Sequence, residues 1–157
     1  MSLTQIPPLN RVSGLRKSIL MIDLDKHKKL IAFAFSKCLE IPRQKKHCSV
    51  ILYKRKIISV GINRFKTHPL AVKHGYLFGE VHSELDALLK CEKRDSGMEL
   101  WNFRFNRHGQ MRISRPCAKC LPWCLKVFDR IHYTTNEGIV EFDKSILANI
   151  TQNRTDS

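Results

Sequence analysis

Two short polar segments, far apart along the chain, constrain the fold more than any other feature of the sequence. His82-Ser83-Glu84 begins one expected helix, and Pro116-Cys117-Ala118-Lys119-Cys120 begins another. A catalytic zinc ion takes three protein ligands and keeps a fourth position for water, and one imidazole with two thiolates satisfies that count. The three residues can hold a zinc ion only if the fold brings the two helix starts together.

The spacing within each segment suits a catalytic site. Cys117 and Cys120 are three residues apart, so on a helix they would share one face. Glu84 lies two residues after His82, which places a carboxylate beside the metal without making it a ligand. Two alternatives stay open: a structural zinc site closed by Cys124 or a loop histidine, and thiol redox chemistry. A structural site would give Glu84 no role, and no early βαβ unit precedes the cysteine pair.

The hydrophobic periodicity predicts helices that alternate with strands. The expected elements are a helix from about residue 25 to 40, strands 49–53 and 57–60, a long loop 61–80, a helix 82–91, a strand 100–105, a helix 117–128, and strands 130–134 and 139–142. This order indicates an α/β protein with a central sheet covered by helices. Asn136-Glu137-Gly138 leaves no room for a crossover helix, which needs about a dozen residues. We therefore expect the last two strands to form an antiparallel hairpin.

The length of 157 residues predicts one domain, with a core of about 20–143 and peripheral or flexible segments at 1–17 and 146–157. There is no apolar run of about 18 residues, so no membrane span is expected. Residues 1–16 show no apolar core of a secretory signal, which favours a cytoplasmic or other intracellular location. In such a reducing compartment, clustered cysteines more often bind metal than form disulfides.

Positive charge is concentrated in the first half of the chain. The net charge is +14, and residues 1–79 hold 16 Lys and Arg against 3 Asp and Glu, which gives +13. A generally basic protein without a polyanionic partner is one explanation. Single-stranded nucleic acid is the partner that we expect, because a small nucleotide does not need so many cations. The cations expected along its path are Lys45, Lys46, Lys54, Arg55, Lys56, Arg64 and Lys66.

The two segments resemble the zinc signature of the cytidine deaminase superfamily, H-x-E followed by P-C-x-x-C. The resemblance covers roughly residues 20–143. Gly61-Ile62-Asn63 is similar to the glycine-x-asparagine segment of tRNA adenosine deaminases and deoxycytidylate deaminases, in which the asparagine holds the sugar. Ser114-Arg115-Pro116-Cys117 is similar to the loop before the cysteines in polynucleotide-editing cytosine deaminases. Ser83 departs from the pattern, because most members have alanine or another small apolar residue there.

The resemblance implies a cytidine deaminase-like fold, with a mixed five-stranded sheet between helices on both faces. It implies one zinc ion per chain held by His82, Cys117 and Cys120, and it implies Glu84 as the catalytic proton carrier. Zinc in such sites lowers the pKa of its water towards about 7, for attack on the amino-bearing carbon. Residues expected to contact the substrate are Asn63, Ser83, Arg115 and Trp123.

The superfamily divides by the direction of its last two core strands. They are parallel in members resembling tRNA adenosine and deoxycytidylate deaminases, and they form a hairpin in members resembling the cytidine deaminases themselves. The expected hairpin therefore places this chain in one branch, whereas Asn63 resembles the other.

These observations predict a hydrolase that converts cytosine to uracil in single-stranded DNA or RNA, as in nucleic acid editing. A deaminase of free cytidine, deoxycytidine or (d)CMP is the first alternative. A non-catalytic, zinc-stabilised nucleic-acid-binding module is the second. Adenine remains open as the base, because the same zinc chemistry serves both bases. Phe65, Tyr76 and Phe78 either stack on a base or anchor the long loop.

Overall fold

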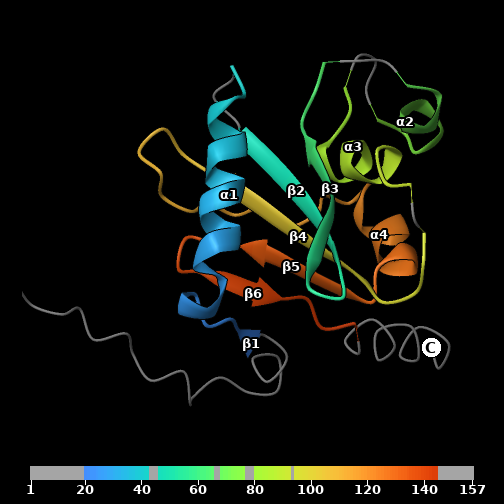
Figure 1. Cartoon of the computed structure of the whole chain (residues 1–157). Coiled ribbons are helices and arrows are strands. Elements are labelled where there is room, and N and C mark those ends of the chain that lie inside the picture. The colour runs from blue at the N-terminus through green and yellow to red at the C-terminus, as the bar shows by residue number, and fades with distance from the viewer. Residues whose placement is uncertain (1–19, 43–45, 66–67, 77–79, 93, 145–157) are drawn as a thin grey trace, which may run out of the picture.

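The computed structural model describes residues 20–42, 46–65, 68–76, 80–92 and 94–144, which form a sheet with helices on both faces (Figure 1). The strands are β1 (Leu20–Met21), β2 (Lys46–Tyr53), β3 (Lys56–Ile62), β4 (Met98–Phe105), β5 (Arg130–Thr134) and β6 (Ile139–Glu141). The helices are the 3-10 turn η3 (Asp25–His27) and the α-helices α1 (Lys28–Leu39), α2 (Pro69–Lys73), α3 (Ser83–Leu89) and α4 (Leu121–Val127). The expected peripheral segments 1–17 and 146–157 lie outside the described residues.

The sheet is mixed, with strand order β1-β6-β5-β4-β2-β3. β4 and β5 are parallel, and the other neighbouring pairs are antiparallel. β5 and β6 pair antiparallel from Thr134↔Ile139 onward, the direction that the short turn between them requires. The expectation of five strands is corrected to six in the described part of the chain, because the two-residue β1 pairs with β6 at the sheet edge.

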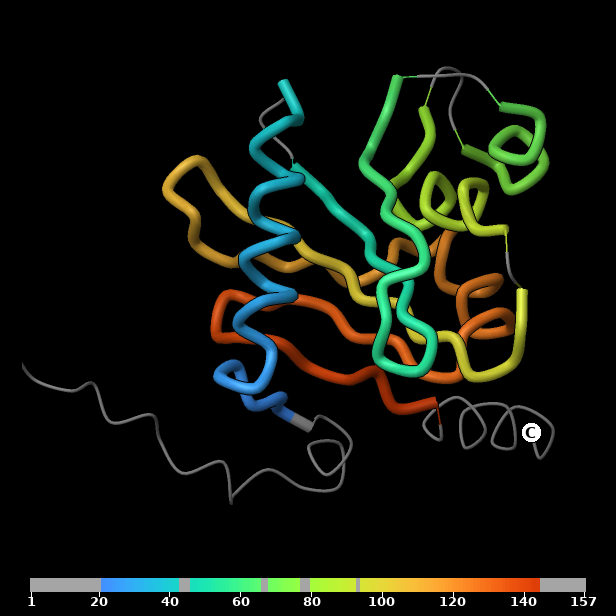
Figure 2. Tube along the Cα trace, in the orientation of Figure 1, coloured from blue at the N-terminus to red at the C-terminus, as the bar shows by residue number. Residues whose placement is uncertain are grey.

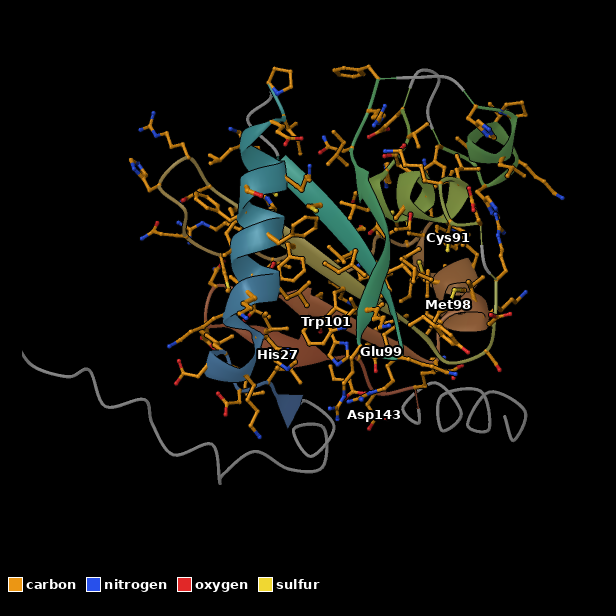
Figure 3. All side chains as sticks on the ribbon, in the orientation of Figure 1. His27, Cys91, Met98, Glu99, Trp101 and Asp143 are labelled. Atoms are coloured by element: carbon orange, nitrogen blue, oxygen red, sulfur yellow. The ribbon has the colours of Figure 1, made fainter. Side chains whose placement is uncertain are left out.

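Side chains alternate between two cores, one on each face of the sheet. On β4, Met98 and Leu100 pack with α3 and α4, whereas Trp101 and Phe103 pack against α1. Figure 3 shows this division, with Cys91 and Met98 on the side of α3 and α4, and Trp101 beside His27 below α1. The tube in Figure 2 shows α1 crossing one face, while α3 and α4 cover the other.

α3 lies unusually close to the sheet because glycine occupies position 61 of β3. A Cβ atom at Gly61 would lie only 2.2 Å from both the Ala87 nitrogen and the Ser83 oxygen of the helix backbone. The Ser59 hydroxyl, also on β3, donates a hydrogen bond of 2.6 Å to the Ala87 carbonyl. β3 therefore fixes the start of α3, where His82 and Glu84 lie.

Two expected elements are corrected by the structure. The segment 61–80 is not a simple loop, because it contains α2, which begins at Pro69 and is capped by the His68 ring accepting from the Leu70 N–H at 3.1 Å. The last helix begins at Leu121 rather than at Cys117, and residues 117–120 form a turn before it. In the described part of the chain, no helix combines the length and the apolar character needed to cross a membrane.

Candidate zinc centre and active site

The three predicted metal ligands come together between α3 and α4. The Nδ1 atom of His82 lies 3.5 Å from the Sγ atoms of both Cys117 and Cys120. The three donor atoms all lie within 4.8 Å of one another. Tetrahedral zinc with ordinary Zn–N and Zn–S bond lengths would separate such a nitrogen and sulfur by about 3.6 Å. The donor set and its spacing therefore fit one zinc ion.

Local structure places the donors differently from the helical face that the spacing suggested. His82 is the N-cap of α3, and Cys120 is the N-cap of α4. Cys117 lies in the preceding turn, whose Cys117 carbonyl accepts from the Cys120 N–H at 3.1 Å. The turn, and not a shared helix face, directs both sulfurs towards His82.

Charge and hydrogen bonding prepare two of the donors for a metal. The hydrogen bonds from the Cys120 thiol and from His82 lower the pKa of Cys117 to about 3, in spite of partial burial. On the other side of the imidazole, the His82 Nε2 lies 3.1 Å from a carboxylate oxygen of Glu80. A carboxylate in that position fixes the tautomer that presents Nδ1 to a metal. The two sequence motifs do not include Glu80.

Among the residues that the structure describes, the group has these three members. Cys124, the candidate fourth ligand of a structural site, is instead fully buried in the core of α4. The geometry therefore favours the three-ligand arrangement over a structural site in which Cys124 would join His82, Cys117 and Cys120 as the fourth ligand.

Glu84 is buried beside this group, with 6% of its surface exposed. One carboxylate oxygen, Oε1, accepts from the Asn102 amide nitrogen at 2.7 Å, and the other, Oε2, lies 3.4 Å from the Ser83 hydroxyl. Desolvation by burial raises the pKa of Glu84. A carboxyl group with a raised pKa is suited to proton transfer near neutral pH.

A buried polar network orients Glu84 from the sheet. The Ser49 hydroxyl of β2 donates to the Asn102 Oδ1 at 2.7 Å, which directs the Asn102 NH2 group towards Glu84. Ser49 also lies 2.8 Å from the Ser83 hydroxyl. The Ser49 hydroxyl has one proton and donates it to Asn102. The Ser83 hydroxyl can therefore donate its own proton either to the Ser49 oxygen or to Glu84. Asn102 belongs to no motif that can be recognised in the sequence, so its contact with Glu84 was not predicted.

The predicted substrate-contact residues are placed in different surroundings. Ser83 is buried next to Glu84, as described above. The Asn63 Oδ1 accepts from the His47 N–H at 3.1 Å, which joins the end of β3 to the start of β2. Arg115 is exposed, with its guanidinium 5.4 Å from the Phe142 ring centroid. Trp123 is 8% exposed and packs in the core of α3 and α4.

The predicted cations are not gathered at this centre. Lys54 and Arg55 form the tip of the β2–β3 hairpin, five and six residues after Ser49 of β2, which is about 17 Å for Lys54 at the usual rise of a strand. Arg64 pairs with Asp86 at 3.2 Å. Lys45 and Lys66 lie outside the described residues.

Three other arginines lie near Asn102 or Cys117 along the chain. In the described part of the chain, their partners are neutral. Arg104 donates to the Ile113 carbonyl at 3.5 Å, Arg112 to the Met111 carbonyl at 3.2 Å and the Gln110 side chain at 3.1 Å, and Arg115 contacts the Phe142 ring. Arg104 is two residues beyond Asn102 on the same face of β4, and Arg115 is two residues before Cys117. We call Arg104, Arg112 and Arg115 the arginine cluster, because they lie near one another along the segments that end β4 and lead to Cys117.

Comparison with known proteins gives a match in structure and none in sequence. No protein-family model matches the chain, and no curated protein matches it significantly. Its fold is similar to that of the dCMP deaminase from the cyanophage S-TIM5, solved in its apo form, with a TM-score of 0.50 and 15% identity. The similarity covers 71% of this chain and 84% of that one. The predicted resemblance is thus confirmed for the fold, and the His-Cys-Cys group could hold the one zinc ion that it implies.

Proposed function

We propose that this protein is a zinc-dependent hydrolytic deaminase that converts cytosine to uracil in single-stranded DNA or RNA. The observation that carries the proposal is the buried Glu84 carboxylate, oriented by Asn102 beside a donor group of His82, Cys117 and Cys120. A buried carboxylate next to a structural zinc site would be costly and without use.

The chemistry follows from these positions. A zinc ion held by the three donors would act as a Lewis acid that activates the attacking water. Glu84 would take one proton from that water and deliver it to the ring nitrogen, and it would then carry the second proton of the water to the departing amino group. Asn102 holds the Oε1 atom throughout, so the Glu84 carboxylate keeps one orientation. The balance is cytosine and water to uracil and ammonia.

The arginine cluster supports a polynucleotide as the substrate. No carboxylate among the described residues pairs with these guanidinium groups, so an incoming phosphate would not have to displace one. The cluster belongs to the end of β4 and the segment that leads to Cys117, so it lies on the chain segments that build the centre. The backbone of Arg112 is joined to that of Arg104, since the Arg112 backbone N–H donates to the Arg104 carbonyl at 2.9 Å. A chain of phosphates can use several such cations, whereas a mononucleotide offers one phosphate.

A free nucleotide, dCMP, is the second candidate substrate. The fold similarity to a phage dCMP deaminase favours it. The two candidates differ in the number of phosphates that the protein must neutralise, and therefore in the salt dependence of binding.

The deciding experiment incubates zinc-loaded protein with cytosine-containing oligonucleotides and, in parallel, with free cytidine and dCMP. Deamination is read out by mass, and adenine-only oligonucleotides test the other base. We expect conversion of cytosine in the oligonucleotides. Turnover of dCMP without turnover of oligonucleotides would instead establish the second candidate. Oligonucleotide binding without any turnover would identify a zinc-stabilised binding module.

Two variants separate chemistry from binding. Glu84→Gln should keep zinc and lose turnover, because Glu84 carries protons and is not among the metal donors. Replacing Arg112 and Arg115 by Ser should reduce the slope of log affinity against log salt by about 1.4, since each lost phosphate contact removes about 0.7. The matched control replaces Lys54 and Arg55 by Ser at the far end of β2. An equal change of slope in the control would reject the assigned role of the arginine cluster.

A further inference from the structure

We propose that Tyr76 and Trp123 form a relay that orients the Cys120 sulfur for zinc. The Tyr76 hydroxyl lies 2.5 Å from the Cys120 Sγ, and the Trp123 Nε1–H donates to that same hydroxyl at 3.2 Å. The inference rests on the zinc centre of the proposed function and does not depend on its substrate.

The direction of these hydrogen bonds follows from the chemistry of the groups. An indole N–H can only donate, so the Tyr76 oxygen accepts from Trp123. A cysteine that ligates zinc is a thiolate and can only accept. The phenolic proton is then the one available between the two atoms, and Tyr76 donates it to Cys120. A phenol that is already accepting a hydrogen bond is a stronger donor, because hydrogen bonds in a chain polarise one another.

The surroundings hold Tyr76 in place. Its backbone N–H donates to the Ala71 carbonyl at 3.0 Å at the end of α2, and both residues are buried in the core of α3 and α4. Its ring also packs against the imidazole of His82, with 4.4 Å between centroids. The short helix α2 is thus followed by a tyrosine that touches two of the three donor residues.

His82 and Cys120 are each contacted by a second residue that can orient the metal-binding atom. Glu80 lies against the far nitrogen of His82, and Tyr76 lies against the sulfur of Cys120. Partners of this kind orient metal ligands, and losing one typically weakens metal affinity by about 10- to 100-fold. Tyr76 and Trp123 are positioning residues in this scheme, because they act on the metal through Cys120.

The test measures metal binding without relying on turnover. Metal-free protein is titrated with zinc against a competing chelator of known affinity, and cobalt replaces zinc to report the thiolate-to-metal charge-transfer band. We expect Tyr76→Phe to weaken zinc about 10- to 100-fold and to shift the cobalt band. Trp123→Phe should have a smaller effect in the same direction. The double variant should be no worse than Tyr76→Phe, because both changes break one relay.

Tyr53→Phe is the matched control, since Tyr53 is the last residue of β2, next to the Lys54-Arg55 turn. This variant should leave zinc affinity and the cobalt band unchanged. Unchanged zinc affinity and an unchanged band in Tyr76→Phe would overturn the relay. If Tyr76→Phe fails to fold, as judged by circular dichroism, Trp123→Phe decides, and wild-type affinity there rejects the relay. Wild-type protein that binds no zinc would overturn both the relay and the proposed function. Zinc binding without deamination would contradict only the proposed function.

Discussion

Replacing His132 by Phe should make the protein less sensitive to acid. His132, on β5, is 1% exposed, and its ring stacks on Trp101 with 3.8 Å between centroids. Its Nδ1 atom has no hydrogen-bond partner in the described part of the chain, and its Nε2 atom lies 3.8 Å from a Glu141 oxygen. Burial disfavours the protonated ring more than the Glu141 carboxylate favours it, and it lowers the pKa of His132 to about 4.

Charged groups from four elements act on this ring. The carboxylates favour its protonation and the cations oppose it, but burial outweighs the carboxylates. These groups are Glu99 on β4, Arg130 on β5, Glu141 on β6 and His27 on η3. Figure 3 shows His27 and Glu99 near Trp101 at this end of the sheet.

The sign and size of the effect follow from the two pKa values. Between the ordinary value of 6.5 and about 4, the unfolded chain binds a proton at His132 that the folded protein does not. The contribution of neutral His132 to the free energy of unfolding is therefore present above pH 6.5 and is lost as the pH falls towards 4. The full loss is about 3 kcal/mol, and about 2 kcal/mol of it falls between pH 7 and pH 5. This is a large part of the stability of a typical domain, about 5–15 kcal/mol.

The assay is urea unfolding at pH 7 and pH 5, followed by circular dichroism. His132→Phe keeps a flat ring against Trp101 and removes the titration, so its loss of stability between the two pH values should be about 2 kcal/mol smaller than that of wild type. Other groups, including the metal ligands, contribute equally to both proteins and cancel in the comparison. His108→Phe, at an exposed histidine, is the control and should behave as wild type. An equal loss in His132→Phe and wild type would refute the argument.

Three further predictions follow from contacts described above. Gly61→Ala should destabilise the protein by several kcal/mol and lower zinc content, because its Cβ would overlap the backbone of α3; a normal melting temperature in that variant would contradict the close approach. Asn102→Leu should lower kcat far more than KM while zinc stays bound, because Glu84 loses the donor that orients it; unchanged kcat would argue against that role. Lys54 and Arg55 both have positive φ, at 49° and 65°, so Asn-Gly in their place should raise stability by about 1 kcal/mol in urea unfolding without changing kcat.

The grouping of His82, Cys117 and Cys120 could be predicted from the spacing of these residues in the sequence. One histidine and two cysteines match the number and type of protein ligands that a catalytic zinc ion requires. The alternation of helices and strands likewise predicted the covered sheet. Glu80 and Tyr76 could not be found in this way, because a single carboxylate or phenol acquires its role only when the fold brings it to a metal ligand.

The errors in the elements also have physical causes. α2 was predicted as loop because it has five residues and is capped by a histidine ring, which is not among the usual capping side chains. The start of α4 was placed too early because the turn 117–120 has the same residue spacing as a helical turn. β1 contributes two residues to the edge of the sheet, too few to show any alternation.

The pairing of β1 with β6 has a consequence for how this chain folds. Leu20 lies beside Glu141, so the outermost ladder joins residues roughly 120 positions apart in the sequence. Contacts of such long range form late, because the intervening chain must be ordered before the ladder can close. During synthesis the β5–β6 hairpin would therefore emerge onto an already built sheet and complete it last. The same adjacency brings the two ends of the described domain together, so a circular permutant that joins them and opens the chain at the Lys54-Arg55 turn should retain the fold.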